Sequence, residues 1–421
     1  MLNKDIMEMS GDEVLSLIPN TTENVVVNKN GRYQLIKLIY KILGYDLTPD
    51  LLLVQLAEDN AMLVSATAGD GKTTYVQSKI ILEKISRISP QTNKPLNGEK
   101  ILCLVYNKHN VAQIETKQRQ LVAKMLSSGV KGLHIDNKVN ATTMHAFCQM
   151  WILQYAGKCG ILNTRLMDDN QTNSFMSSAL RTIAKKTGED IQYLAVSKVL
   201  NLYNIVRESL IEYDDLDKVE TFASMQTSKE LLVEVFELYD KLKKGRSLYD
   251  FPDMLSIFLK LLRENEEVRT YIQDYYEYIT ADEFQDFTPI MIEILRLIKR
   301  DDIPLICIGD EDQNIYAFRG ANINGILNFE ELFKDGKVYS LAVNRRCREN
   351  ILADAKFIIE HNKLRHKKNI KAVKTGGHVE YIPYASQEGQ LLNLLKKLGK
   401  MEYDDLDNTI ICYRNNKSSY K

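Results

Sequence analysis

The chain has 421 residues, 44% of them hydrophobic and 26% charged, with a formal net charge of −1. This composition is typical of a globular protein with more than one core, and it excludes the overall basicity that would by itself indicate nucleic acid. The six cysteines are scattered, and no apolar run reaches the length of a membrane span, so we expect a cytoplasmic protein with no disulfide framework, zinc site or membrane contact.

The first predicted segment is a small helical lead-in over residues 1–45, to which we assign no chemistry. Val25 to Val27 is a candidate short strand within it. A weakly amphipathic helix is expected from Leu47 to Leu63, leading into a short apolar strand that begins near Met62.

Residues 62–74 have the order strand, small-residue loop and helix, which is the context of a phosphate-binding loop. Glycines tolerate the backbone dihedrals that turn N–H groups toward phosphate oxygens. Lys72 is expected to reach the β- and γ-phosphates of a nucleotide and Thr73 to bind Mg²⁺, beside a positive helix end. The alternative is a glycine turn before a helix. The candidate nucleotide-binding residues are Ala66, Thr67, Ala68, Gly69, Asp70, Gly71, Lys72, Thr73 and Thr74.

Farther along the chain, apolar runs alternate with segments of helical pattern, which predicts a parallel, doubly wound α/β sheet. Residues 149–245 are charged and poor in proline and glycine, so we expect a helical insertion there. Strands are expected at 100–108, 278–286, 304–310, 338–343 and 409–413, and helices at 111–126 and 348–362.

Two of these strands end in side chains suited to nucleotide hydrolysis. Asp282 is expected to hold Mg²⁺ and Glu283 to polarise the attacking water, although acidic pairs are also common on surfaces. Gln313 follows another strand end and is a candidate sensor of the γ-phosphate. Its neighbours Tyr316, Phe318 and Arg319 could stack on nucleic acid bases, with core packing as the alternative for the aromatic rings.

Blocks in this order resemble the superfamily 1 DNA helicases of the UvrD/Rep/PcrA type. The phosphate loop is similar to the family's variant A-x-A-G-x-G-K-T, which explains Ala66. The other blocks are Tyr106-Asn107-Lys108 (motif Ia), Thr143-Met144-His145-Ala146-Phe147 (motif Ib), Asp282-Glu283-Phe284-Gln285-Asp286 (motif II), Gly309 to Ala321 (motif III) and Asn344-Arg345-Arg346 (motif IV).

The resemblance implies an ATP-dependent DNA helicase that moves on single-stranded DNA, typically 3′ to 5′, in DNA repair, replication or recombination. ATP and Mg²⁺ would lie between two RecA-like motor domains, and the DNA partner would be a single strand or a single-strand/double-strand junction. The implied domains are the first motor domain at 46–148 and 246–335, the insertion at 149–245, and the incomplete start of a second RecA-like domain at 336–421.

The resemblance also assigns roles to single residues. Arg346 would contact the γ-phosphate from the second domain, and Gln313 would couple that site to DNA. The implied DNA-binding residues are Asn107, Lys108, Thr143, His145, Tyr316, Phe318 and Arg319. A basic run from Arg345 to Lys374 that includes Arg365, Lys367 and Lys368 is a candidate phosphate-backbone surface or a solvated face.

The sequence departs from the family pattern in the base pocket and at its end. Leu51 stands where the family has a glutamine that recognises adenine, with Gln55 one turn later, and Arg345 replaces a tyrosine that stacks on the base. Strict ATP preference is therefore open. The later motifs V and VI are not found, so we expect a truncated helicase, a fragment, or one half of a split motor with a C-terminal partner. The alternative function is a nucleotide-gated module that binds single-stranded DNA or a partner without turnover.

Overall fold

The computed structural model describes residues 6–18, 25–129, 135–189, 194–314 and 323–412. Contacts between elements divide the chain into two units, residues 1–375 and 376–421. None of the helices in these described ranges is both long enough and apolar enough to cross a membrane.

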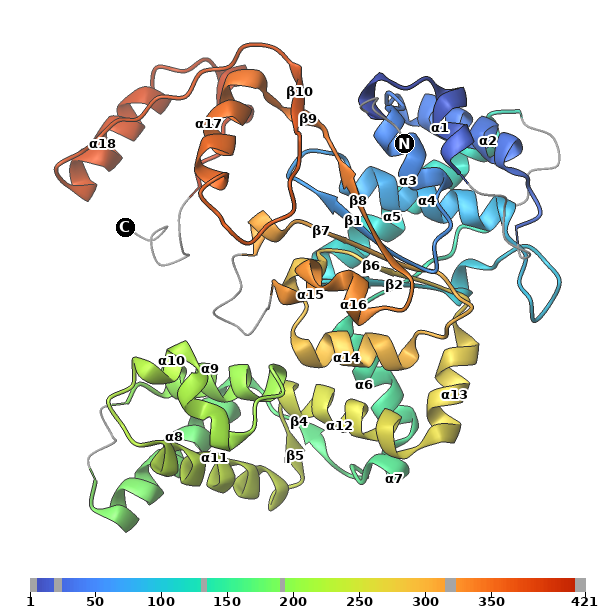
Figure 1. Cartoon of the computed structure of the whole chain (residues 1–421). Helices are drawn as coiled ribbons and strands as arrows, with labels where there is room; N and C mark the ends of the chain where they lie inside the picture. The colour runs from blue at the N-terminus through green and yellow to red at the C-terminus, as the bar shows by residue number, and fades with distance from the viewer. Residues whose placement is uncertain (1–5, 19–24, 130–134, 190–193, 315–322, 413–421) are drawn as a thin grey trace. The chain divides into compact units, whose positions relative to one another are not determined.

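A six-stranded sheet forms the centre of the first unit (Figure 1). Every neighbouring pair of its strands is parallel, which confirms the predicted α/β class and matches a RecA-like domain. The order across the sheet is β3 (Asn140–Thr143), β2 (Ile101–Val105), β6 (Tyr278–Ala281), β7 (Leu305–Gly309), β1 (Ala61–Ala66) and β8 (Gly336–Leu341). The sheet therefore includes β8, which lies beyond residue 335.

Alternate residues of the strands enter two separate cores, as the period of a strand requires. Ala61 and Leu63 of β1 face one core, whereas Met62 and Val64 face the other. Helices cover both faces, on opposite sides of the sheet in Figure 1. The first core is covered by α6 (Met144–Gln154), α12 (Phe251–Glu264), α13 (Glu266–Tyr275) and α14 (Pro289–Ile298), and the second by α1 (Gly11–Leu17), α2 (Lys29–Leu43), α3 (Pro49–Leu56), α4 (Lys72–Ser86) and α5 (Lys108–Ser127).

The helical segment between β3 and β6 has a hydrophobic core of its own. Its main helices are α8 (Asp169–Thr187), α9 (Val196–Glu208), α10 (Glu220–Ala223) and α11 (Lys229–Lys244), and a short parallel pair, β4 (Arg165–Leu166) with β5 (Leu248–Tyr249), closes it. Trp151 and Ile152 of α6 belong instead to the core of the sheet, so the start of the predicted insertion packs with the motor domain. The short helix α7 (Ala156–Cys159) follows α6.

The chain after β7 passes through short helices, α15 (Asn324–Leu327) and α16 (Phe329–Leu332), before β8. It continues through β9 (Val343–Arg348), α17 (Glu349–Ile359) and β10 (Lys371–Lys374), and β9 pairs with β10 in a separate parallel ladder. The second unit contains α18 (Gln387–Leu398) and α19 (Tyr403–Asp407). Single 3-10 turns occur at Ile6–Glu8, Gly98–Lys100, Tyr213–Lys218, Phe284–Asp286 and Glu311–Gln313.

Three expected elements differ from the structure. The helix expected over 47–63 spans only α3, because the chain turns at Ala57 to enter β1. Val25 forms an isolated antiparallel bridge with Arg87 rather than a strand. The strand expected at 409–413 is wrong for the described residues 409–412, which are irregular. Ile410 is 86% exposed there, so its apolar side chain is not buried against a neighbouring strand.

Candidate active site

The carboxyl ends of parallel strands lie at one edge of a sheet, where ligands of open α/β folds gather. The loops after β1, β6 and β7 meet at this edge, since β7 pairs with both of the other strands. These loops carry the phosphate-loop residues, the acidic pair and Gln313. The fold therefore brings together the predicted residues of the nucleotide site.

The loop between β1 and α4 has the geometry of a phosphate cradle. Gly69 and Gly71 both have positive φ angles, 97° and 92°, which favour glycine. The Asp70 carboxylate accepts hydrogen bonds from the backbone nitrogen and the hydroxyl of Thr67, each at 2.7 Å. These bonds within the loop stabilise its conformation. Burial raises the pKa of Asp70 to about 6.

Lys72 begins α4 and forms an ion pair with Glu283, the predicted catalytic base. Its Nζ lies 3.2 Å from Oε2 of Glu283, the residue that follows Asp282 after β6. Glu283 has a φ of 53°, a left-handed conformation that is uncommon away from glycine and often marks functional positions. The predicted lysine and the predicted base are thus in direct contact.

Gln285 connects this pair to the next strand. Its Nε2 donates to Glu283 Oε2 at 2.8 Å, and its Oε1 accepts from the backbone nitrogen of Asp310 at 2.9 Å. Gln313 in turn donates from Nε2 to Asp310 Oδ2 at 2.5 Å. We did not single out Gln285 or Asp310 from the sequence, although both lie inside the motifs that carry the resemblance.

Asp282 is buried beside this network. Burial and the neighbouring Glu283 charge raise its pKa to about 6, and the nearby Lys72 charge opposes the shift. Its Oδ1 accepts from the backbone nitrogen of Glu283 at 3.0 Å. Asp282 and Thr73 supply carboxylate and hydroxyl oxygens, which are the ligands that Mg²⁺ prefers, so these residues fit the predicted metal role.

The segment before α17 lies directly against the phosphate loop. Asn344 Nδ2 donates to the Ala68 carbonyl at 2.6 Å, and the Arg345 backbone nitrogen donates to the Gly69 carbonyl at 3.0 Å. A Cβ added at Gly69 would lie 2.7 Å from Cβ of Arg346. The structure therefore places the predicted γ-phosphate arginine next to the loop.

Arg345, one of the two departures in the base pocket, and Gln55, one turn after the other departure at Leu51, have different structural surroundings. Arg345 donates to the Asp46 carbonyl and the Thr48 hydroxyl, and its guanidinium lies 5.6 Å from the centre of the Tyr45 ring. Gln55 is fully buried and donates to the hydroxyl groups of Tyr40 and Ser78. Gln55 is thus part of the core between α2, α3 and α4.

The predicted DNA residues of motifs Ia and Ib lie at the ends of adjacent strands. Asn107 caps α5 through the Asn110 nitrogen, and Thr143 caps α6 through the Ala146 nitrogen. Lys108, the first residue of α5, is exposed. Tyr316, Phe318 and Arg319 lie outside the described residues.

His145 is half-buried in the first turn of α6. Its ring meets the Phe251 ring edge-on, with 5.7 Å between their centres. Burial lowers the pKa of His145 to about 4, so the imidazole is neutral at pH 7. A neutral imidazole can donate a hydrogen bond or pack against a base, but it cannot form an ion pair with a phosphate.

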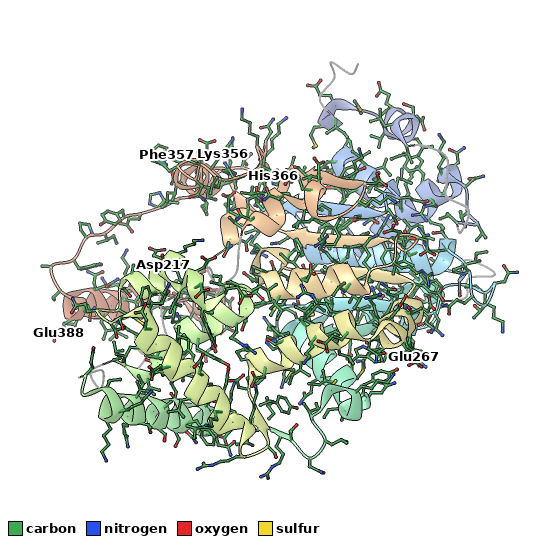
Figure 2. All side chains as sticks on the ribbon, turned by 60° about the horizontal axis from the view of Figure 1, so that its bottom comes forward. Asp217, Glu267, Lys356, Phe357, His366 and Glu388 are labelled. Atoms are coloured by element: carbon green, nitrogen blue, oxygen red, sulfur yellow. The ribbon has the colours of Figure 1, made fainter. Side chains whose placement is uncertain are left out.

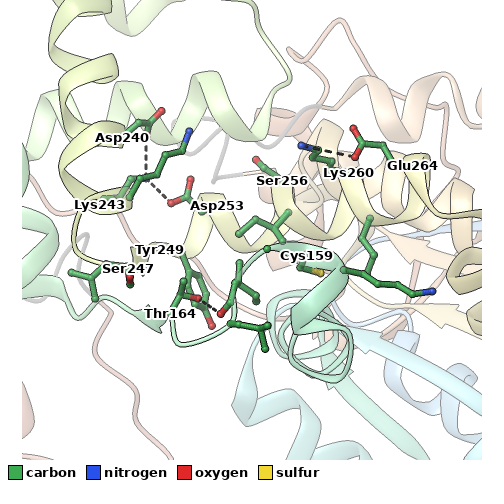
Figure 3. A pocket seen from close by; sticks show the side chains of 18 of the residues that line it. Cys159, Thr164, Asp240, Lys243, Ser247, Tyr249, Asp253, Ser256, Lys260 and Glu264 are labelled. Atoms are coloured by element: carbon green, nitrogen blue, oxygen red, sulfur yellow. Dashed lines mark hydrogen bonds and ion pairs between the residues drawn. The ribbon is translucent and has the colours of Figure 1, made fainter.

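A cavity of about 850 Å³ lies between the helical segment and the sheet domain (Figure 3). Residues of α7, β5, α11 and α12 line it, and none of the predicted site residues is among them. At its wall the Lys243 ammonium pairs with Asp240 at 3.1 Å and with Asp253 at 2.6 Å. The cavity is therefore separate from the nucleotide site.

Comparisons with known proteins agree with this geometry. The family model of the UvrD/REP helicase N-terminal domain matches residues 48–334. The ATP-dependent DNA helicase PcrA of Staphylococcus epidermidis is 24% identical over 371 residues, which are 86% of this chain and 47% of that protein. PcrA of Leuconostoc citreum is 25% identical, over 86% of this chain and 46% of that protein.

A further relative is a probable DNA helicase II homolog of Mycoplasma capricolum, which is 27% identical over 85% of this chain and 47% of that protein. The chain thus spans about half the length of the curated relatives it matches.

Proposed function

This chain belongs to the UvrD/REP helicase family, and from that membership we propose that it hydrolyses ATP and couples the hydrolysis to movement on single-stranded DNA. The proposed direction is 3′ to 5′, and the proposed setting is DNA repair, replication or recombination. The DNA partner would be a single strand or a junction of single- and double-stranded DNA.

The observation that carries the proposal is the contact between Lys72 and Glu283, with 3.2 Å between their charged atoms. A lysine after a glycine-rich loop binds phosphate as a point charge. A carboxylate 3.2 Å from that lysine would orient a water molecule toward the same phosphate. Binding of a γ-phosphate to Lys72 would exchange the ion pair for a phosphate contact and leave Glu283 available to the water.

The remaining residues support this chemistry by position. The backbone nitrogens of the 66–71 loop would hold the phosphates, and Asp282 with Thr73 would hold Mg²⁺. When bound, Mg²⁺ would neutralise charge that develops on the phosphate oxygens. Arg346 would add a second positive charge, and Gln313, within motif III, would couple the γ-phosphate site to DNA.

The proposed DNA path begins at the ends of β2 and β3. Asn107 and Thr143 cap helices there, so each offers a side chain whose position is fixed by its own helix. We propose that Lys108 and His145 contact the strand beside them, and that Tyr316, Phe318 and Arg319 provide stacking surfaces.

The proposal is tested by steady-state ATP hydrolysis of the 421-residue chain with and without single-stranded DNA, using Glu283→Gln as the blank. We expect turnover that DNA stimulates, and we expect Glu283→Gln to bind nucleotide without hydrolysing it. Glu283→Gln with full activity would assign the base elsewhere.

Binding of nucleotide and DNA by the wild-type chain without turnover would favour the alternative function, a nucleotide-gated binding module. Lys72→Ala serves as the second control, because the proposed site loses its phosphate-binding ammonium. Wild-type nucleotide affinity in Lys72→Ala would contradict the phosphate-loop assignment itself.

A further inference from the structure

Three consecutive acidic residues directly precede the proposed γ-phosphate sensor, Gln313, in the sequence. Asp310, Glu311 and Asp312 follow β7 and precede Gln313. The side chains of all three carboxylates are at most 2% exposed. Burying adjacent carboxylates is costly unless each is paired and hydrogen-bonded, so the partners of this triplet are informative.

The ion-pair partners come from one short segment, residues 362–368, between α17 and β10; the Ser65 hydroxyl of β1 also donates to Glu311 Oε2 at 3.0 Å. Arg365 binds Asp312 through two nitrogens at 2.9 and 3.2 Å, and Asn362 donates to the other oxygen of Asp312. The backbone nitrogen of His366, labelled in Figure 2, donates to Glu311 Oε1 at 2.9 Å.

Lys368 makes the central contact of this segment. Its Nζ lies 2.9 Å from Asp310 Oδ1 and 2.8 Å from Glu311 Oε2, and its side chain is 0% exposed. Hydrogen bonding from His366 and the charge of Lys368 overcome the effect of burial and hold the pKa of Glu311 well below its usual value. The prediction of a phosphate-contacting or solvated surface is therefore wrong for Lys368, whose ammonium is enclosed by protein carboxylates.

The position of Lys368 has a direct consequence for Gln313. Asp310 uses Oδ1 to bind Lys368 and Oδ2 to accept from Gln313 Nε2 at 2.5 Å. The backbone nitrogen of Asp310 donates to Gln285, which in turn donates to Glu283. Lys368 and the backbone nitrogen of Asp312, which donates to the same Oδ1 at 3.2 Å, thus fix the carboxylate that holds the sensor, and Gln285 connects the same aspartate to the predicted base Glu283.

We propose that Lys368 is a positioning residue for the γ-phosphate response: it orients Asp310 so that Gln313 is held at the nucleotide edge of the sheet. The segment 362–368 would then transmit the position of β9, which adjoins the phosphate loop, and of its partner strand β10 to Gln313. This inference rests on the proposed function, because it assigns a γ-phosphate contact to Gln313.

The test compares the dissociation constants of ATPγS and ADP, each with Mg²⁺, by calorimetric titration. Lys368→Met should weaken ATPγS binding about tenfold relative to ADP, the order expected for loss of one hydrogen bond that involves a charged group. Lys367→Met is the matched control, because Lys367 is exposed, and it should keep the wild-type ratio. Lys368→Arg should recover most of the ratio.

A purely structural role would lower both affinities together and leave the ratio unchanged, and that result would overturn the inference. In a Gln313→Ala background, Lys368→Met should no longer change the ratio of ATPγS to ADP affinity. Without the Gln313 side chain, Asp310 has no sensor to hold. A further loss there would also contradict the inference.

Failure of the proposed function and failure of this inference alone give different results. A wild-type chain that binds neither nucleotide would overturn the proposed function and this inference with it, whereas an unchanged ratio in a nucleotide-binding chain overturns the inference alone. If Lys368→Met does not fold, Lys368→Met/Glu311→Gln leaves fewer unpaired carboxylates and is compared with Glu311→Gln in the same assay.

Discussion

At the scale of single residues, the buried Asp282 predicts how nucleotide binding depends on pH. Its pKa is raised to about 6, so the carboxyl group takes up a proton as the pH falls through that value. Mg²⁺ needs the carboxylate form, and metal affinity falls when ligands are protonated. We therefore expect Mg²⁺-dependent nucleotide affinity to be constant above pH 7 and to weaken below pH 6, by up to about tenfold per pH unit.

The measurement is a titration with Mg²⁺-ATPγS between pH 5 and 8. The charged groups near Asp282 are Glu283, Lys72 and Lys117. Asp70, whose pKa is also about 6, titrates in the same range, so Asp282→Asn is needed as a control. Asp282→Asn should bind more weakly at pH 7 and show a shallower pH dependence. An unchanged pH profile in Asp282→Asn would remove this residue from the metal site.

The sequence indicated candidate residues where a local motif suggests a role. Lys72, Asp282 and Glu283 could be named as candidates because a phosphate loop and an acidic pair after a strand each have a recognisable spacing, and the structure brings Lys72 and Glu283 into contact. Lys368 could not be assigned in this way, because its partners precede it by more than fifty residues. A charge run alone does not say which of its members will be buried.

At the scale of elements, Thr143 has two roles that mutation can separate. Its hydroxyl caps α6 by accepting from the Ala146 nitrogen at 3.2 Å, and it is a proposed DNA contact. Thr143→Ala should lower the free energy of unfolding by about 1 kcal/mol and weaken single-stranded DNA binding. Thr143→Ser keeps the hydroxyl and should restore both. Chemical denaturation and a DNA titration measure the two effects.

Ser228→Ala is the matched control for this experiment, since Ser228 caps α11 through the Leu231 nitrogen. Ser228→Ala should lower the free energy of unfolding by a similar amount and leave the affinity for single-stranded DNA unchanged. If Thr143→Ala and Ser228→Ala have the same DNA affinity, Thr143 is only a helix cap.

Strands that are buried on both faces were predictable as elements, because they read as continuous apolar runs. The runs at β2, β6 and β7 became central strands of the sheet. The run at 409–412 has the same composition, but its residues are irregular and Ile410 is exposed. Composition therefore identifies a segment that can become a strand, and a neighbouring strand decides whether it does.

At the scale of the whole molecule, Lys243 joins the helical segment to the sheet domain. Its buried ammonium binds Tyr203 of α9 at 3.0 Å and, at the start of α12, Asp250 at 2.8 Å and Asp253 at 2.6 Å. Lys243→Met would leave Asp250 without its cation, whereas Asp253 keeps an ion pair with Arg207 at 3.4 Å. Removing one partner of a buried ion pair typically costs 3–5 kcal/mol. We expect about 3 kcal/mol, because Asp253 lines the adjacent cavity (Figure 3) and its side chain is 16% exposed, so it is only partly desolvated.

Urea denaturation of Lys243→Met checks this value, with Lys244→Met as the control. Lys244 is exposed, so its replacement should change the free energy of unfolding by less than about 0.5 kcal/mol. Equal stability of the two variants would show that the ionic cluster contributes nothing net to the junction.

The helical composition of 149–245 indicated an insertion, and the structure shows a separate hydrophobic core for α8 to α11. The limits of the sheet domain were harder to predict. Helix α6 crosses the proposed boundary at 148 and strand β8 begins just after the one at 335, yet both pack with the sheet. Such limits depend on which surfaces an element buries, and one sequence does not specify that.

The order of the strands also has a consequence for biosynthesis. Strand β1 leaves the ribosome early, but its neighbours β7 and β8 are contributed by residues from 305 and from 336 onward. Translation of the roughly 240 residues that separate β1 from β7 takes on the order of ten to fifty seconds at about 5–20 residues per second. During that interval the phosphate-loop strand has neither of its partners. The apolar strand β1 therefore stays unpaired for a long time during translation, and molecular chaperones that bind exposed apolar strands could bind it in that interval.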